Sequence, residues 1–321
     1  MASAPRPQVL ALSGGVGGAK LSLGLADVLP AGDLHLLINT GDDFKHLGLH
    51  ICPDIDTHLY TLAGLANPEQ GWGLAGESWH TMAALEHLGG ETWFRLGDKD
   101  LATHLWRTQQ LATGQGMAAI TAALARRMGI GSHIDPMTED PVHTVVHAES
   151  GELPFQQYFV RDQCQPVVTG FRFSGIESAR PNPRVMELLD QHGFSCIVIC
   201  PSNPFVSVDP ILQVPGLWPA LLDNPARVVV VSPIVAGQAI KGPAAKMMRE
   251  LGMAVTAEGV ARHYIERYPG LMDCFVIDES DATLAPAIEH LGVEVAITPT
   301  VMTSREDKQR LARFTLQLGE Y

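Results

Sequence analysis

Short apolar runs alternate with helical patterns along most of the chain. The runs are rich in β-branched residues, lack polar alternation and are bounded by Gly, Pro, Asn or Ser, which is typical of parallel strands buried on both faces. We expect strands at 9–12, 34–38, 196–200, 228–231, 274–277 and 293–297. We expect helices between and after them at 19–29, 183–192, 243–251, 258–267, 284–291 and 304–318. This order predicts an α/β fold with a doubly wound, mainly parallel, Rossmann-like sheet.

The middle of the chain has a different pattern. Helical periodicity dominates from 57 to about 128, with segments near 56–65, 77–88, 99–111 and 116–128. Strand-like alternation follows at 141–147 and 154–160. We therefore interpret 58–180 as a mostly helical insertion that forms a lid or wall over a cleft, and 1–57 with 181–321 as the nucleotide-binding core.

A glycine-rich loop follows the first expected strand and leads directly into a helical pattern. It contains Gly14, Gly15, Gly17 and Gly18 and is followed by Lys20. Glycines let the backbone approach an anion closely, and the N–H groups at a helix start attract it, so the loop predicts a phosphate site. The loop lacks the Gly-Lys-Ser/Thr of a P-loop and the spacing of a dinucleotide fingerprint. A glycine-rich turn without function is the alternative.

Acidic residues follow the second expected strand and precede the next helical stretch. Asp42 and Asp43 come after a Thr-Gly turn, and Asp56 lies in the segment Pro53-Asp-Ile-Asp-Thr57. Because ligands of open α/β sheets bind at the carboxyl ends of the strands, these carboxylates are candidate Mg²⁺ ligands, and Asp56 is also a candidate general base. The alternatives are a solvated turn for the acidic pair and a helix N-cap for Asp56 or Thr57.

Polar residues also follow strands in the second half of the chain. Ser202 and Asn203 lie between two prolines, Ser232 follows the next strand, and Lys241 precedes a proline at a helix start. Hydroxyl, amide and lysine groups in such loops are candidate phosphate or nucleobase donors. The alternative is that the serines and the asparagine only form turns in these loops and bind no ligand.

Histidines and tryptophans gather in the first half. His46, His50 and His58 lie near Cys52, but their spacing matches no closed zinc site. Four of the five tryptophans fall within the expected insertion, where they serve core packing or stack on a flat ligand. The five cysteines are scattered, which favours reduced thiols over a disulfide framework.

Composition excludes some classes of function. The chain has 321 residues, of which 46% are hydrophobic and 18% charged, as in an ordinary globular enzyme. Its formal net charge of -13 argues against a nucleic acid partner. The N-terminus has no apolar signal region and no segment has the length of a membrane span, so we expect a cytoplasmic protein without a membrane partner.

Read together, these motifs resemble the 2-phospho-L-lactate transferase family, the LPPG:Fo transferases of coenzyme F420 biosynthesis. The resemblance covers nearly the whole chain. In the first hundred residues it rests on Ser13-Gly-Gly-Val-Gly-Gly-Ala-Lys20, Asn39-Thr-Gly-Asp-Asp43, Ile51-Cys-Pro-Asp-Ile-Asp-Thr57 and Trp93-Phe-Arg-Leu-Gly-Asp-Lys-Asp100. In the second half it rests on Pro201-Ser-Asn-Pro204, Ser232-Pro-Ile234 and Met302-Thr303.

The resemblance implies a Mg²⁺-dependent phosphotransferase. The donor would be a guanylylated three-carbon phosphoacid, and the acceptor the ribityl hydroxyl of the deazaflavin 7,8-didemethyl-8-hydroxy-5-deazariboflavin (Fo). The products would be GMP and coenzyme F420-0 or an analogue. It further implies that Asp56 and Arg95 contact Fo, that Asp42, Asp43 and Asp56 serve Mg²⁺ or the hydroxyl, and that the protein is a homodimer. An ion pair of Arg95 with Asp98 or Asp100 is the alternative for this arginine.

Three questions stay open at this point. The donor carries a phospholactyl, phosphoenolpyruvyl or phosphoglyceryl group. A related branch, the gluconeogenesis-factor-like proteins, binds nucleotide sugars without known chemistry, so a regulator without turnover is the alternative function. A nicotinamide oxidoreductase is a weaker alternative, because the second strand does not end on an acidic residue.

Overall fold

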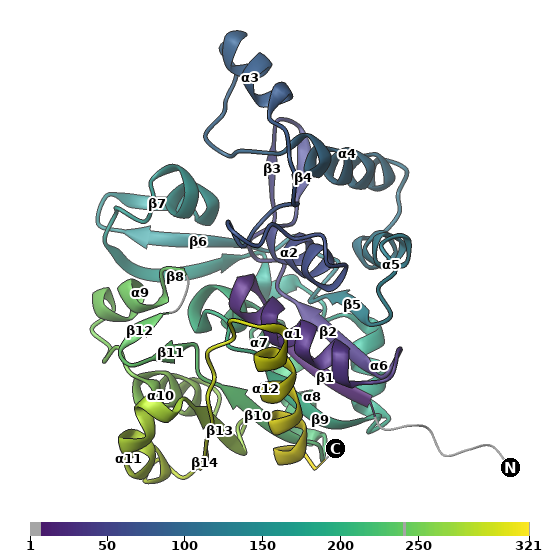
Figure 1. Cartoon of the computed structure of the whole chain (residues 1–321). Helices are drawn as coiled ribbons and strands as arrows, with labels where there is room; N and C mark the ends of the chain where they lie inside the picture. The colour runs from purple at the N-terminus through teal and green to yellow at the C-terminus, as the bar shows by residue number, and fades with distance from the viewer. Residues whose placement is uncertain (1–7, 240–241, 321) are drawn as a thin grey trace, which may run out of the picture.

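A computed structural model describes residues 8–239 and 242–320 of the chain, and Figure 1 shows it as a whole. In this part of the chain a seven-stranded sheet forms the centre, in the order β14-β13-β10-β9-β1-β2-β5, and every neighbouring pair is parallel. Its strands are β1 (Gln8–Ser13), β2 (Leu34–Ile38), β5 (His133–Pro136), β9 (Phe194–Ile199), β10 (Arg227–Val231), β13 (Cys274–Ile277) and β14 (Glu294–Ile297). The predicted α/β fold with a doubly wound parallel sheet is confirmed.

The strand order reverses between β1 and β9. The chain builds outward from β1 through β2 to β5, and then returns to the other side of β1 to build from β9 to β14. In open α/β sheets the crevice outside the carboxyl ends of the strands at such a reversal is where ligands bind. The loops after β1 and β9 therefore mark the expected position of a site.

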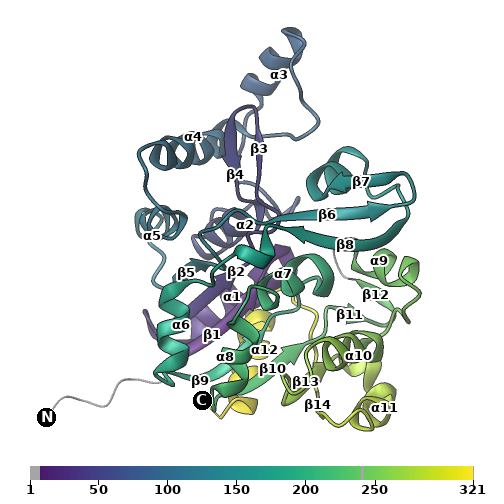
Figure 2. The same cartoon turned by 180° about the vertical axis from the view of Figure 1, so that it is seen from behind.

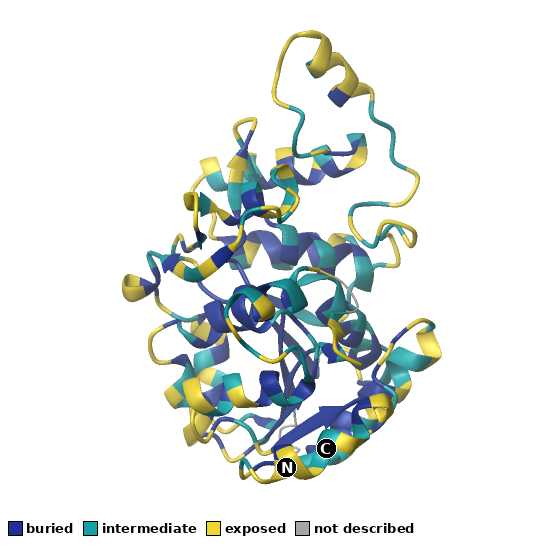
Figure 3. Ribbon diagram, turned by 90° about the vertical axis from the view of Figure 1, so that its left-hand side faces the viewer, coloured by how far each residue is buried: buried dark blue, intermediate teal, exposed yellow. Residues whose placement is uncertain are grey.

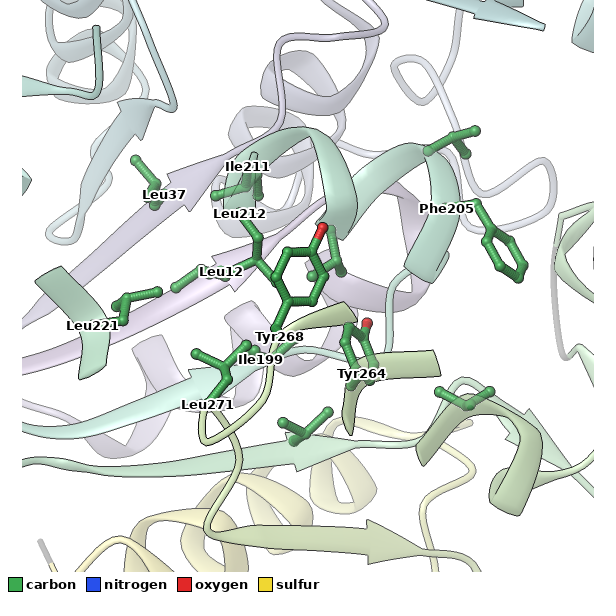
Figure 4. Packing of buried hydrophobic residues seen from close by; sticks show 14 of the residues in the cluster. Leu12, Leu37, Ile199, Phe205, Ile211, Leu212, Leu221, Tyr264, Tyr268 and Leu271 are labelled. Atoms are coloured by element: carbon green, nitrogen blue, oxygen red, sulfur yellow. The ribbon is translucent and has the colours of Figure 1, made fainter. Parts of the chain in front are cut away.

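Helices cover both faces of the sheet. One face carries α1 (Gly15–Val28), α2 (Pro53–Leu62), α5 (Met117–Arg127) and α12 (Arg305–Leu318), and the other carries α6 (Pro183–Asp190), α7 (Asp209–Leu212), α8 (Leu217–Asp223) and α10 (Ala257–Arg267) (Figures 1 and 2). The strand residues divide between two cores accordingly, with Val9 and Ala11 on the first face and Leu10 and Leu12 on the second. Figure 4 shows the second core, where Leu12, Leu37 and Ile199 lie among side chains of α7, α8 and α10.

The range expected as an insertion contains one strand of the central sheet. Strand β5 pairs with β2 from His35 opposite His133 to Ile38 opposite Pro136, so this part of 58–180 belongs to the core. Its sequence, His-Ile-Asp-Pro, is too short and too polar to read as a buried strand, which is why the apolar pattern does not predict it. The parts of the range outside the sheet are therefore 58–132 and 137–180.

The upper part of the molecule is built from a hairpin, two helices and a small antiparallel sheet. They are β3 (Phe44–His46) with β4 (Leu49–Ile51), α3 (His80–His87), α4 (Asp98–Ala112), and β7 (Gly151–Pro154), β6 (His143–Ala148) and β8 (Val168–Ser174). Helix α3 stands farthest from the central sheet and is largely exposed (Figures 1 and 3). The expected strand at 154–160 is wrong, because Gln157–Arg161 forms a π-helical turn that buries Phe155 and Tyr158, three residues apart, on one side.

Shorter elements complete the fold. They are the strands β11 (Ile234–Val235) and β12 (Gln238–Ala239), the helices α9 (Ala244–Glu250) and α11 (Ala285–Glu289), a π-helical turn at Pro204–Val208, and 3-10 turns at Ile176–Ser178 and Glu279–Leu284. All five cysteines are free. Among the described residues no single helix is long and apolar enough to cross a membrane, and one bent pair, Pro204–Leu212 with Leu217–Asp223, passes that test by length and composition only.

Candidate active site

A cleft of about 800 Å³ opens at the carboxyl ends of the central strands, where the strand order reverses. Its floor is formed by the glycine loop after β1 and by the loops after β9 and β10. Its wall is formed by helices α2 and α4, the loop before α4 and the turn at Gln157–Arg161. The cleft therefore brings together segments from both halves of the chain, and its volume accommodates ligands of nucleotide size.

The glycine loop begins helix α1 as the sequence predicts. Gly14 is the N-cap residue, and Gly15, the first helical residue, has a φ of 62°, which favours glycine. Gly14, Gly15, Gly17 and Lys20 line the cleft. Gly18 does not, and serves close packing instead, since a Cβ there would collide with the hydroxyls of Ser13 and Ser202. The N-terminus of this fourteen-residue helix faces the cleft and is suited to an anion.

Ser202 joins the two loops that flank the reversal of strand order. Its hydroxyl donates to the Gly14 carbonyl oxygen at 2.8 Å and accepts from the Gly14 N–H at 3.1 Å. Asn203 and Ser232 also line the cleft. The Asn203 side chain accepts from the Phe205 N–H and donates to Met247 Sδ, and the Ser232 hydroxyl bonds to the backbone of Ile234. Lys241 lies outside the described residues. Of the candidates from the second half, Ser202 is thus the one tied to the glycine loop.

Asp54, which the sequence analysis does not select, contacts the glycine loop directly. One carboxylate oxygen accepts from the Gly15 N–H at 2.7 Å and the other from the Asn39 side-chain amide at 2.9 Å. Burial raises the pKa of Asp54 to about 6, against the opposing effect of these hydrogen bonds. Helix α2 begins at Pro53, so the expected N-cap at Asp56 or Thr57 is wrong. Asp54 and Asp56 both lie in its first turn, and residues two apart on a helix point in different directions.

Asp42 is the second carboxylate on this side of the cleft. It lines the cleft, is 7% exposed, and its Oδ1 has no hydrogen-bond partner among the described residues. Burial raises the pKa of Asp42 well above its ordinary value, and the nearby charge of Asp54 adds to this. Two buried carboxylates that repel each other next to a phosphate-type loop are a donor set suited to a hard divalent cation such as Mg²⁺.

Asp43 points elsewhere. It does not line the cleft, and its carboxylate lies 3.6 Å from His50 Nε2. Burial raises the pKa of Asp43, although His50 opposes this effect. The structure therefore separates the two adjacent aspartates that the sequence places together, with Asp42 toward the glycine loop and Asp43 toward the β3–β4 hairpin. Of the other two histidines near Cys52, His46 packs against Trp93 and His58 bonds to Ser13, so the three do not converge.

Asp56 lines the cleft from the other side of α2 and is held by an arginine. The Arg107 guanidinium binds both carboxylate oxygens of Asp56, with Nη1 at 3.0 Å from Oδ2 and Nη2 bonded to Oδ1. The Arg107 side chain is completely buried. Burial opposes its charge, but the Asp56 carboxylate and other neighbouring groups favour it, and on balance the pKa of Arg107 is raised. The buried bidentate ion pair thus fixes the orientation of the Asp56 carboxylate, which serves as a hydrogen-bond acceptor.

The network continues along the wall through three further side chains that line the cleft. His104 Nδ1 lies 3.6 Å from Asp56 Oδ2, and His104 Nε2 lies 3.2 Å from Asp100 Oδ1. The Tyr60 hydroxyl donates to the same Asp100 oxygen at 2.5 Å. Sequence reasoning misses Asp100, His104 and Arg107 because α4 reads as an ordinary charged helix. The available signal is that three polar residues, at 100, 104 and 107, recur on one helical face.

Arg95 lines the same wall near an aromatic surface. Its guanidinium lies over the Trp79 ring, 4.3 Å from the ring centroid. The expected alternative, an ion pair with Asp98 or Asp100, is not what the structure shows, because Asp98 caps helix α3 and Asp100 bonds to Tyr60. The aromatic side chains that line the cleft are Tyr60, Trp72, Trp93, Phe94, Phe155 and Phe159. They form a surface suited to a flat heteroaromatic ligand.

Comparisons with known proteins identify the family to which the chain is similar. The family model described as 2-phospho-L-lactate transferase CofD matches residues 9–302. A phosphoenolpyruvate transferase of Streptomyces coelicolor is 39% identical over 318 residues, with 98% of each chain covered. A 2-phospho-L-lactate transferase of Methanosarcina acetivorans is 35% identical, with 97% of this chain and 98% of that protein covered.

Among solved structures, a UPF0052 family protein of Bacillus halodurans superposes with a TM-score of 0.65, and the match covers 98% of this chain and 100% of that one. The two sequences are 15% identical, so this likeness shows the fold alone.

Proposed function

Because this chain belongs to the 2-phospho-L-lactate transferase family, we propose that it transfers a phospho-three-carbon-acid group to the deazaflavin Fo. The donor is a guanosine-diphospho-linked three-carbon acid and the acceptor is the ribityl hydroxyl of Fo. The products are GMP and coenzyme F420-0 or its analogue. The reaction places the protein among phosphotransferases that act late in coenzyme F420 assembly.

One observation carries the proposal: a single cleft joins an anion-binding end to an aromatic end. The glycine loop, Ser202 and Asp42 line this cleft, and so do Trp72 and Arg95. We assign the first group to the anion-binding end and the second to the aromatic end. Phosphoryl transfer needs the donor diphosphate and the acceptor hydroxyl side by side and in line, and catalysis consists mainly of positioning and charge neutralisation. A cleft with both ends open to each other supplies that arrangement.

The anion-binding end is suited to the donor diphosphate. The Gly15 N–H already donates to Asp54. The other first-turn N–H groups of α1 have no partners within the helix, and the positive end of the helix dipole lies at the cleft. Lys20 lines this end of the cleft as well. When Mg²⁺ is bound, Asp42 and Asp54 would hold it, and it would neutralise charge on the diphosphate. The expectation that Asp43 and Asp56 are also metal ligands stays a prediction, and we place Asp42 and Asp54 first because both line the cleft beside the glycine loop.

The acceptor end is suited to Fo. The aromatic side chains would contact the deazaflavin ring, and Arg95 and Asp56 would bind its polar groups, as the family resemblance implies. In the reaction, the hydroxyl oxygen bonds to the phosphorus that carries the three-carbon acid, the bond from that phosphorus to the GMP oxygen breaks, and the hydroxyl proton passes to water. Asp56, fixed by Arg107, is placed to accept a hydrogen bond from the hydroxyl and orient its attack. The role of Asp43 as a catalytic residue also stays a prediction.

Among the three donors, we propose the phosphoenolpyruvyl form. The relatives from Streptomyces coelicolor and Nocardia farcinica, at 39% and 37% identity, are both phosphoenolpyruvate transferases, whereas the Methanosarcina acetivorans 2-phospho-L-lactate transferase is 35% identical. The three donors differ in a small group next to the reacting phosphate, so discrimination between them is a matter of pocket contacts at that point.

The test is to incubate the purified protein and Mg²⁺ with Fo and each of the three guanylylated acids, and to identify the products by mass spectrometry. We expect one transferred group per Fo, an equal amount of GMP, and the highest rate with the phosphoenolpyruvyl donor. Asp42→Asn should lower the rate at least tenfold with each donor. Binding of nucleotides without any product would overturn the proposal and favour the regulator without turnover.

The homodimer and the cytoplasmic location remain expectations that follow from the family resemblance and from composition. Light scattering of the purified protein at several concentrations tests the first. A mass of twice 34.6 kDa would support the dimer, and a mass of 34.6 kDa throughout would contradict it.

A further inference from the structure

A second group of ligand-type side chains lies beside the cleft and has no part in the proposed reaction. The β3–β4 hairpin pairs Phe44 with Ile51, so that Asp43, one residue before the hairpin, comes to lie near Cys52, one residue after it. His50, on β4, points to the same place. One ligand atom from each of Asp43, His50 and Cys52 lies within 4.8 Å of the other two. A carboxylate, an imidazole and a thiol thus converge from a single hairpin.

These side chains are largely buried, and the Asp43 carboxylate lacks one hydrogen-bond partner. Cys52 is fully buried, the Asp43 side chain is 8% exposed and the His50 side chain is 24% exposed. Asp43 Oδ1 is buried and has no hydrogen-bond partner among the described residues, so the carboxylate is incompletely satisfied. Its other oxygen lies 3.6 Å from His50 Nε2, beyond a good hydrogen bond.

The charges around the group are compatible with a divalent cation. Arg107 is the nearby cation, but its guanidinium is already paired with Asp56 through two hydrogen bonds. A divalent ion bound to the Asp43 carboxylate and to the Cys52 thiolate would give a neutral centre, because binding releases the thiol proton. His50 would contribute as a neutral ligand through Nε2. Metal binding with release of the thiol proton would therefore neutralise the single negative charge that the Asp43 carboxylate otherwise carries in this buried region.

We propose that Asp43, His50 and Cys52 form a site for a zinc-type transition metal, separate from the site for Mg²⁺. Zn²⁺ takes thiolate, imidazole and carboxylate ligands at about 2.0–2.3 Å, so ligand atoms in a tetrahedral centre lie roughly 3.3–3.8 Å apart. The present separations, of up to 4.8 Å, need to close by about 1.5 Å or less to reach that geometry. A thiolate ligand selects against Mg²⁺, which prefers oxygen. Three protein ligands leave a fourth position for water.

The site would fix the base of the hairpin to the start of helix α2. Cys52 is the N-cap residue of α2, and this helix carries Asp54 and Asp56 in its first turn. A metal at this position would therefore stabilise the wall from which both carboxylates reach the cleft. This inference does not depend on the proposed function, because none of the three ligand residues lines the cleft.

The test uses the full chain, stripped of metal with a chelator and dialysed against Zn²⁺ or Co²⁺. We expect one Zn²⁺ per chain by elemental analysis, a thiolate-to-cobalt charge-transfer band in the near ultraviolet with Co²⁺, and a rise in Tm that grows with Zn²⁺ concentration. Cys52→Ser and His50→Gln should weaken binding at least tenfold and remove the rise in Tm. Asp42→Asn should leave Zn²⁺ binding unchanged, since Asp42 belongs to the other site.

Cys274→Ser is the matched control, because Cys274 is also a fully buried, free cysteine but lies on β13 in the central sheet. It should keep the metal and the cobalt band. Absence of stoichiometric Zn²⁺ from the wild-type chain, a cobalt spectrum without a thiolate band, or a band that survives in Cys52→Ser would overturn the proposal. If a variant fails to fold, the cobalt spectrum of the wild-type chain decides the matter alone.

Discussion

The buried ion pair between Asp56 and Arg107 allows a sharp test of how the acceptor end is organised. The Arg107 side chain is fully buried and that of Asp56 is 7% exposed. In Arg107→Met, a side chain of similar length fills the space but leaves the Asp56 carboxylate buried without its cation. Removing one partner of a buried pair costs about 3–5 kcal/mol of unfolding free energy, because the remaining charge is uncompensated.

The same geometry exists on the surface and provides a control. Arg305 binds Asp27 through two hydrogen bonds, at 2.7 and 2.5 Å, but its side chain is 64% exposed. The Asp27 side chain is 10% exposed, but it keeps a hydrogen bond from the Gln309 amide at 3.0 Å when Arg305 is replaced. Because Arg305 itself is largely in water, Arg305→Met should cost about 1 kcal/mol. The contrast between the two methionine variants tests the effect of burying the arginine, since both pairs are bidentate and both carboxylates are largely buried.

The assay is urea unfolding followed by tryptophan fluorescence at pH 7.5, combined with the double variant Asp56→Asn/Arg107→Met. The double variant should lose about 1–3 kcal/mol less unfolding free energy than the sum of the losses in the two single variants, because contacting residues are coupled. Transfer activity should stay low in the double variant, because Asp56 is gone. Equal losses of unfolding free energy in Arg107→Met and Arg305→Met would refute the reasoning. So would a loss in the double variant that equals the sum of the losses in the two single variants.

Three further predictions concern the glycine loop and the far end of the sheet. Ser202→Ala removes both hydrogen bonds to Gly14, at 2.8 and 3.1 Å, and should raise the KM for the donor about tenfold with less effect on the KM for Fo, in steady-state kinetics. Gly18→Ala should lower Tm in differential scanning calorimetry, because its Cβ would collide with the Ser13 and Ser202 hydroxyls, and an unchanged Tm would contradict the packing role. Burial, with His35 and Arg184, lowers the pKa of His133 to about 4, so the unfolded chain binds more protons between pH 6.5 and 4, and stability falls as pH drops through that window. His133→Gln should reduce this loss of unfolding free energy by about 1 kcal/mol, measured by urea unfolding at pH 7 and pH 5. The figure is discounted for solvent because the ring is partly exposed, and an unchanged pH dependence would be the contrary result.

The apolar pattern predicts the central sheet well because buried parallel strands leave a clear signal. All six strands expected in the parallel sheet are present, and the loops after β1 and β9 meet at the reversal of strand order. Strand β5 is missed because His133 and Asp135 interrupt its apolar character. The turn at Gln157–Arg161 is misread as a strand because alternation over seven residues does not distinguish a strand from a short helical turn when the buried residues are three apart.

The site could be predicted where its residues are close in sequence and not where the fold brings distant residues together. The glycine loop, Asp42 and Asp56 are found from local motifs, and all but Gly18 of the loop candidates line the cleft. Arg107 meets Asp56 across 51 positions, and no local pattern reveals that contact. The division of Asp42 and Asp43 between two environments likewise depends on the hairpin that follows them, not on their adjacency.

The central claim is that a single cleft holds the donor diphosphate and the deazaflavin at the same time and transfers the group between them. It is tested most directly by a single-turnover measurement with enzyme in excess, in which GMP and the coenzyme product are quantified from the same quenched samples. The account predicts that both appear together, in equal amounts and with one rate constant, and that neither forms when Fo is omitted. GMP release without Fo, or nucleotide binding with no product at any time, would contradict it.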